Sequence, residues 1–349
     1  MGVRIVDPLN ITEWINLTKG VEYIPVRRNL TGNLGLFQSE YLDTNTAILP
    51  ITNVNDYEMV DIPWGTRVKN TLRDGKARLR LEVPHFAVED SVRPMDIAGK
   101  VDFDDFMLQN RSQIVGNFID KKKEKARQAI ANTWARAQMG LIRDGTAYAP
   151  NGTVVNNYYT AFGVVRSDLT LDLNPANNPK VSIQAAIDNI VDNFKGGFVP
   201  SRFVAFAGRN LFDALANHPF VLENARIYSS DQWSVEVLTG ILGTQGYNLT
   251  ARYQVIDFGG VIWIRTSDVV KEIPADEARL FPTDLPDLFK VFFAPSDLTF
   301  DTVNSPAQEE YYFEKMESDR TALNFTYETN FLVATLWPKA IVKLTAVYS

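Results

Sequence analysis

The sequence predicts an α+β fold built around one very long helix, and two patterns support that prediction. Apolar residues recur at helical spacing from about Gln109 to Arg143, and at 1.5 Å per residue such a helix runs roughly 50 Å. Before it, charged and apolar residues alternate from Lys76 to Val83, the pattern of a strand with one solvated face. The predicted helix is longer than a compact domain needs. A helix of this length beside a charged ribbon is typical of a subunit of an assembly rather than of an enzyme core.

Composition favours a folded protein and excludes several kinds of chemistry. The 349 residues allow two or three domains, and 45% hydrophobic content is enough for real cores. Because there is no cysteine, disulfides, thiolate nucleophiles and cysteine metal sites are excluded. The formal charge of -7 argues against tight binding to nucleic acid. No secretory signal and no apolar run of the ~20 residues that cross a bilayer is found, so we expect a soluble intracellular protein without membrane contact.

The first hundred residues predict an irregular arm followed by a long hairpin. Residues 1–43 show no sustained period. Beyond them, candidate strands separated by the turn-prone Pro63-Trp64-Gly65 and Asp74-Gly75 are Ala47–Ile51, Glu58–Ile62 and Lys76–Val83. The basic face of this hairpin has no obvious partner in the chain, so we expect a neighbouring subunit to cover it.

The long helix is predicted from one apolar stripe with a charged interruption. Asp102, Asp104 and Asp105 precede it, where capping of free amide hydrogens explains them better than a metal site does. We expect Lys121 to Lys125 to face solvent or a neighbour. The stripe consists of Val115, Phe118, Ile119, Ala126, Ala129, Ile130, Thr133, Trp134, Ala137 and Leu141.

The remainder of the chain predicts a small hairpin, an α+β module and returning strands. Asp144-Gly145 ends the helix, and Asn151-Gly152 turns the chain between Thr146–Tyr148 and Val154–Tyr159. After an Asn- and Pro-rich linker at 174–179, Ser182 is expected to cap a helix ending at Gly196-Gly197. The elements predicted next are a strand Phe203–Ala207, a helix Leu211–Asn217, strands Arg252–Ile256 and Val261–Arg265, and from Glu309 to Val347 strands that should pack on the long helix.

We identify no catalytic, metal or cofactor site in the sequence. His85 and His218 lie in unrelated contexts without metal-ligand spacing, and a structural role is favoured for both. Gly196-Gly197 and Gly259-Gly260 form no phosphate-binding motif. Trp134 and Trp263 are expected in the core, whereas interface burial competes with that interpretation for Trp64.

The charged ribbon is the candidate site, as an interface between subunits. Nucleic-acid contact is the alternative, but the acidic total of the chain favours pairing with acidic faces of sister subunits. The candidate interface residues are Trp64, Arg67, Lys69, Arg73, Lys76, Arg78, Arg80 and Glu82.

The order of these elements resembles that of the tailed-phage major capsid proteins of the lambda-type E family. Local points of resemblance are Ala137–Pro150, at the end of the long helix, and Thr326–Ala340. The resemblance implies an HK97-like fold with an N-terminal arm, an extended E-loop, a P domain with the spine helix, and an A domain. The implied boundaries are 1–43 for the arm, 44–98 for the E-loop, 99–178 for the P domain, 179–300 for the A domain and 301–349 for returning P-domain strands.

The resemblance also implies a function. Such proteins assemble in the host cytoplasm into hexamers and pentamers of an icosahedral head that encloses double-stranded DNA, with help from scaffold and portal. Lambda-type shells commonly carry a decoration protein at three-fold positions, whereas some relatives form a Lys-Asn cross-link; the sequence, with Lys69 and Lys76 on the ribbon, favours neither. The alternatives are a tail-tube or connector protein, and an oligomeric α+β enzyme or binding protein. An enzyme should show convergent titratable residues, and the sequence offers no recognisable set.

Overall fold

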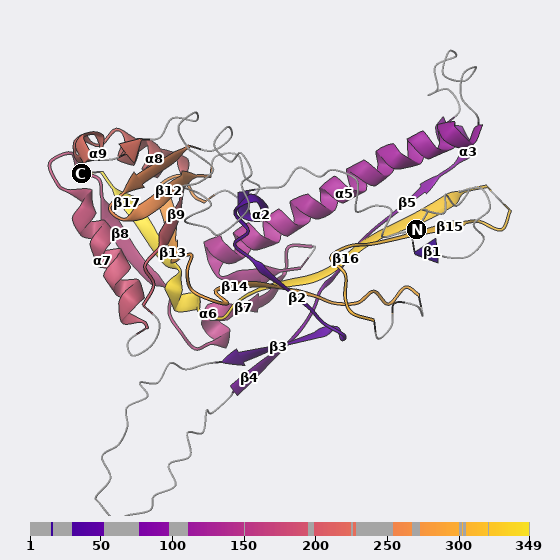
Figure 1. The fold of residues 1–349 in the computed structure, drawn as a ribbon, viewed down its shortest axis with the longest axis horizontal. Coiled ribbons are helices and arrows are strands. Elements are labelled where there is room, and N and C mark those ends of the chain that lie inside the picture. The colour runs from indigo at the N-terminus through magenta and orange to yellow at the C-terminus, as the bar shows by residue number, and fades with distance from the viewer. Residues whose placement is uncertain are drawn as a thin grey trace, which may run out of the picture.

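In a computed structural model, the chain forms a compact end and an elongated half joined by one long helix (Figure 1). The structure describes residues 15–16, 30–51, 77–97, 111–149, 151–194, 199–224, 226–227, 254–266, 273–299, 302, 305–319 and 321–348. The predicted strand Glu58–Ile62 and the capping residues Asp102, Asp104 and Asp105 lie outside these ranges.

The predicted long helix is confirmed as α5, Arg111–Asp144, with 34 residues. Its two ends are buried differently. Among the side chains described in its N-terminal half, a narrow stripe that includes Ile119, Ala126 and Ile130 is buried, whereas Met139, Leu141 and Ile142 near the C-terminus are fully enclosed. The helix is followed by Gly145, whose φ of 65° is the left-handed conformation that glycine adopts at low cost. The N-terminal part of α5 therefore lies along the elongated sheet, and its C-terminal end lies in the compact core.

The compact end contains a seven-stranded mixed sheet in the order β10-β11-β12-β9-β13-β17-β8. Trp263, Phe206 and Phe281 are fully buried in its core. The predicted strand β9 and the pairing of β11 with β12 are confirmed, but β11 spans Val255–Phe258 rather than the predicted Arg252–Ile256. In sequence order the strands are β8 Ser167–Asp172, β9 Phe203–Ala207, β10 Arg226–Ile227, β11 Val255–Phe258, β12 Val261–Arg265, β13 Glu277–Pro282 and β17 Val342–Val347.

Helices α7 Pro179–Asp192, α8 Arg209–Ala216 and α9 Pro219–Asn224 accompany this sheet, with the short η2 Pro338–Ala340 preceding β17. The expected cap of α7 was wrong. Asn178, not Ser182, caps the helix by accepting a hydrogen bond from the amide of Lys180, and Pro179 occupies the first turn. The helix also stops at Asp192, before the expected Gly196-Gly197. Ser182 lies inside the helix, and its hydroxyl accepts a bond from the amide of Asp172 at 3.4 Å.

The elongated half is a second sheet in the order β1-β15-β16-β14-β2, with β5 also paired to β16. Its strands are β1 Ile15–Asn16, β2 Gln38–Tyr41, β5 His85–Val92, β14 Phe289–Phe293, β15 Tyr311–Met316 and β16 Leu323–Thr335. The first part of β16 pairs with β15 and β5, and its last five residues pair with β14. Short helices α2 Leu30–Leu34 and α3 Pro94–Ile97 precede β2 and follow β5. As expected, these late strands pack on α5.

Two hairpins complete the fold. The ribbon strands β3 Thr46–Ile51 and β4 Ala77–Glu82 pair as predicted, with Leu49 opposite Leu79. The smaller hairpin of β6 Thr146–Tyr148 and β7 Val154–Asn157 is also confirmed, but it ends early. Tyr158 and Tyr159 belong to α6 Tyr158–Ala161, because the Asn157 side chain accepts the amide hydrogen of Thr160 and starts a helical turn.

Candidate inter-subunit interface

The root of the ribbon is anchored to the body by one face only. Ala47 and Leu49 of β3 are fully buried, and Leu79 and Leu81 of β4 pack against the same core. Because side chains alternate along a strand, the residues between them point the other way. The ribbon is therefore a half-buried hairpin whose second face is available for contact.

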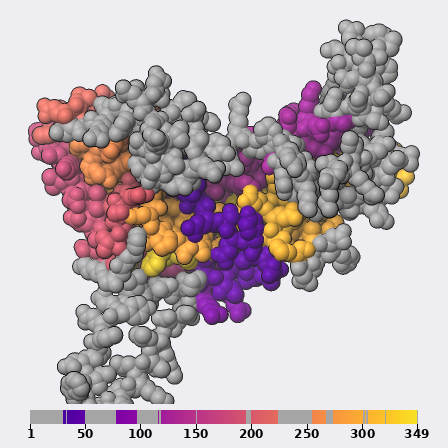
Figure 2. All heavy atoms as spheres, in the orientation of Figure 1, coloured from indigo at the N-terminus to yellow at the C-terminus, as the bar shows by residue number. Residues whose placement is uncertain are grey.

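That second face is basic. Arg78, Arg80 and Glu82 are exposed, and Ile48, directly opposite Arg80, is 48% exposed. No described residue forms an ion pair with Arg78 or Arg80. In Figure 1 the β3–β4 ribbon lies at the edge of the body, on the side away from α5. In Figure 2 residues 30–51, in indigo, form part of a continuous face between the compact end and the late strands.

Of the eight candidate interface residues, the structure brings together Arg78, Arg80 and Glu82 on this face. The other five lie outside the described residues: Trp64, Arg67, Lys69, Arg73 and Lys76.

Charged side chains attach the spine helix α5 to the elongated sheet. Lys123 Nζ lies 2.8 Å from the buried carboxylate of Glu314, and Arg127 lies 2.6 Å from that of Glu310. Lys122 lies 2.8 Å from Asp90 of β5. The expectation that Lys121 to Lys125 all face solvent or a neighbour was therefore wrong for two residues, because the sheet supplies carboxylates from more than thirty residues away in the chain.

These buried carboxylates were missed in the sequence, although a signal was present. Glu314 is 2% exposed and lies on the same face of β15 as Tyr312 and Met316, which pack under α5. Its second partner is the Tyr312 hydroxyl, which donates to it. A charged residue at one of the alternate, inward-facing positions of a buried strand indicates a buried partner of opposite charge. The lysine cluster on the helix is that partner.

The junction between α5 and the seven-stranded sheet is held by a buried arginine. Arg279 of β13 is 2% exposed, and its Nε donates to the carbonyl oxygen of Arg143 in the last turn of α5 at 2.8 Å. Burial lowers the pKa of Arg279, and its partner Glu277, at 2.9 Å, partly offsets that effect. The Arg279 guanidinium therefore donates to a carbonyl oxygen that has no hydrogen-bond partner within the helix.

A second set of bonds fixes the same turn. Asp144 accepts hydrogen bonds from Arg143 and from the Tyr148 hydroxyl. Burial acts to raise the pKa of Asp144, but these two donors outweigh it and the pKa lies below its ordinary value. Gly145 follows, and a Cβ placed there would overlap the Tyr159 ring.

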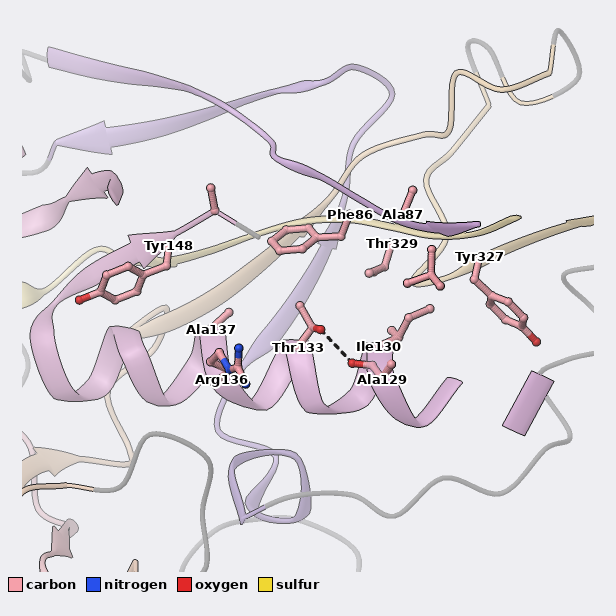
Figure 3. A pocket seen from close by; sticks show the side chains of 12 residues that line it. Phe86, Ala87, Ala129, Ile130, Thr133, Arg136, Ala137, Tyr148, Tyr327 and Thr329 are labelled. Atoms are coloured by element: carbon pink, nitrogen blue, oxygen red, sulfur yellow. Dashed lines mark hydrogen bonds between the residues drawn. The ribbon is translucent and has the colours of Figure 1, made fainter. Parts of the chain in front are cut away.

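A groove runs between α5 and the β5–β16 edge, with a cavity of about 190 Å³ (Figure 3). Two of its threonines are engaged in hydrogen bonds, whereas the buried hydroxyl of Tyr327 has no hydrogen-bond partner among the described residues. Thr133 donates to the carbonyl of Ala129, and Thr329 accepts from the indole of Trp134. The wall residues are mostly apolar, including Phe86, Ile130 and Ala137. The groove therefore offers surface for packing and no convergent set of reactive groups.

The two histidines and the tryptophans Trp134 and Trp263 have structural surroundings. His85 Nδ1 lies 2.7 Å from the Asn330 amide oxygen, and His218 Nε2 lies 3.0 Å from the carbonyl of Asn174. Trp134 packs edge-on to Phe293 and Phe331, and Trp263 is fully buried, so their expected core positions are confirmed. Within the described ranges no three acidic, histidine or cysteine side chains could hold a metal ion. No helix in the part of the chain that the structure describes has the length and apolar character of a membrane span.

A charged hairpin, a spine helix and a compact α+β end fit the class of viral shell subunits, and the family match supports that class. The family model described as phage major capsid protein E matches residues 13–346, and this chain belongs to that family. The major capsid protein of Pseudomonas phage KPP10 is 29% identical over 350 residues, which cover 96% of this chain and 97% of that protein.

A solved structure supports the fold. The crystal structure assigned to a capsid protein of a prophage in E. coli CFT073 superimposes with a TM-score of 0.57 at 12% identity, covering 96% of this chain and 100% of that one. The HK97-like α+β fold expected from the resemblance is confirmed. Proteins of this family are structural, so the chain is a phage major capsid protein and a component of the virion, not an enzyme.

Proposed function

We propose that copies of this chain assemble into hexamers and pentamers of an icosahedral head that encloses packaged double-stranded DNA. The observation that carries the proposal is the exposed basic face of the β3–β4 ribbon in a member of a major capsid protein family. Arg78 and Arg80 find no acidic partner among the described residues of their own chain. A second copy supplies the acidic surface, since complementary charge fixes the register of an interface.

The contact is heterologous, because the ribbon differs from any surface it could meet on a sister subunit. Heterologous contacts form closed rings when the rotation between copies closes. The anchored root keeps the ribbon in a defined direction, and the exposed Ile48 adds apolar area that becomes buried on docking. We extend the interface along the ribbon to Trp64, Arg67, Lys69, Arg73 and Lys76, with Glu82 at its root.

The proposed organisation follows the capsid subunit plan. Residues 1–43 form the N-terminal arm, 44–98 the E-loop, 99–178 the P domain, 179–300 the A domain and 301–349 the returning P-domain strands. The pairing of β5 with β16 supports a close connection between the end of the E-loop and those returning strands. The Arg279 junction supports a fixed angle between the A domain and the spine helix.

We propose partners for this chain from its resemblance to the tailed-phage major capsid proteins. Scaffold and portal proteins act during assembly in the host cytoplasm, and a decoration protein reinforces three-fold positions. Packaged DNA lies near the inner surface without sequence-specific contacts, because a net charge of -7 disfavours a tight grip on phosphates. No membrane contact is proposed.

Electron microscopy of the purified protein alone tests the proposal. We expect closed shells or hexameric and pentameric capsomers. Tubes or stacked rings would indicate a different lattice, and a population of dimers or other small closed oligomers at all concentrations would overturn the proposal.

A further inference from the structure

The strand β16 changes partners at a buried polar node. Residues up to Asn330 pair with β5, and residues from Phe331 onward pair with β14. Leu323, Phe325 and Tyr327 face α5, so the alternate residues Glu328 and Asn330 lie on the opposite face. Both contact the segment 294–298, which follows β14 and leads toward β15.

Three hydrogen bonds join this segment to β16, and a fourth lies within the segment. The Ala294 amide donates to the carbonyl of Asn330 at 2.9 Å, and the Asn330 side chain donates to the carbonyl of Pro295 at 3.1 Å. The Ser296 hydroxyl donates to Glu328 at 2.5 Å and accepts from the amide of Leu298 at 3.3 Å. Glu328 and Ser296 are 2% and 1% exposed. The Glu328–Ser296 bond is therefore enclosed.

Glu328 differs from the other buried carboxylates of this sheet because no lysine or arginine among the described residues pairs with it. Glu310 and Glu314 have Arg127 and Lys123. The titratable groups around Glu328 are His85 and Glu89 from β5, Asp297 from the segment itself and Tyr311 from β15. An ionised carboxylate buried without a cation is costly, whereas a neutral carboxyl keeps an oxygen for the Ser296 bond.

We propose that Glu328 is a proton-controlled latch, which holds the segment 294–298 against β16 when neutral and loosens it when charged. Burial raises the pKa of Glu328 by more than the Ser296 hydrogen bond and the charge of His85 lower it, which agrees with this direction. The sign follows from linkage: a carboxyl whose pKa is raised in the folded state contributes stability that is present at low pH and is lost as pH rises through the folded-state pKa. Mild acid should therefore tighten this part of the subunit.

Hydrogen exchange of the full-length chain, read by mass spectrometry on peptides spanning 294–298 and corrected for intrinsic exchange rates, tests the latch. In the natural sequence, protection should increase several-fold from pH 8 to pH 5. Glu328→Gln, a neutral mimic, should give the high protection at both pH values. Ser296→Ala removes the donor and should give low protection at both. Glu124→Gln, an exposed carboxylate on α5, should behave as the natural sequence does.

Two results would overturn the latch. One is protection of 294–298 in the natural sequence that does not change with pH after correction. The other is a Glu328→Gln variant that keeps the natural pH dependence. Because the readout is local to the subunit, neither result depends on whether shells form.

Discussion

The compact end and the elongated half of this subunit are stabilised by different chemistry. The compact end is closed by apolar packing, as in β9, where all five residues are buried, and in the T-shaped contact of Phe206 with Phe281. In the elongated half, a narrow apolar stripe is supplemented by ion pairs between α5 and buried sheet carboxylates. Apolar packing dominates the first region, whereas the β3–β4 ribbon leaves a charged face exposed, which we propose is covered by another copy of the chain.

The largest expected effect tests the apolar half of this comparison. Phe206→Ala removes a fully buried ring and should lower the free energy of unfolding by about 3–5 kcal/mol. Urea unfolding of the subunit measures the change. The control Val165→Ala, at an 86% exposed position, should stay near zero, and equal losses in both variants would contradict apolar closure.

The next effect tests the ion pairs of the elongated half. Glu314→Gln keeps an acceptor for the Tyr312 hydroxyl but leaves Lys123 with only the exposed Asp120, 4.0 Å away, as a counter-charge, so it should cost about 3 kcal/mol of unfolding free energy. The double variant Lys123→Met with Glu314→Gln removes the poorly compensated charge and should recover most of that loss. If the double variant is as unstable as the single one, the ion pair is not what holds the helix there.

A third prediction concerns the junction of the two regions. Gly145→Ala adds a Cβ that overlaps the Tyr159 ring, in addition to the left-handed backbone strain. Gly152→Ala is the matched control, since its φ of 83° carries the strain but no atom lies within 4 Å. Gly152→Ala should lower the free energy of unfolding by about 1–2 kcal/mol. Thermal unfolding should show a clearly larger loss for Gly145→Ala, and equal losses would show that the junction is loosely packed.

The smallest effect depends on pH. Because the pKa of Asp144 is lowered on folding, its contribution is present above the unfolded value near 3.8 and is lost as pH falls through the folded-state pKa. Asp144→Asn should therefore cost about 1 kcal/mol at pH 7 and progressively less below pH 3.8. Denaturant titrations across this range measure it. A loss that is constant with pH would assign the effect to packing rather than to charge.

Local patterns predicted the elements well, and long-range partners poorly. The periodicity of α5, the alternation in β4 and the Asn151-Gly152 turn each depend on neighbouring residues, so the sequence was sufficient. The α7 start was mispredicted because Ser182 and Asn178 are both good caps, although Pro179, a residue type favoured in the first helical turn, was a local signal for Asn178. Arg127 meets Glu310 across 183 positions in the chain, and no periodicity reports such a pairing. The three described ribbon residues were placed correctly on an exposed face, but their role as an interface stays a prediction.

The central claim is that the basic face of the ribbon is completed by another copy of the chain. Arg78→Glu with Arg80→Glu tests it most directly, because exposed substitutions change the free energy of unfolding by only about 0.5 kcal/mol. The matched control, Lys180→Glu with Lys339→Glu, makes the same change in net charge at exposed sites of the compact end. Electron microscopy should show shells or capsomers for the control and dispersed subunits of natural stability for the ribbon variant. Normal shells from the ribbon variant would contradict the claim.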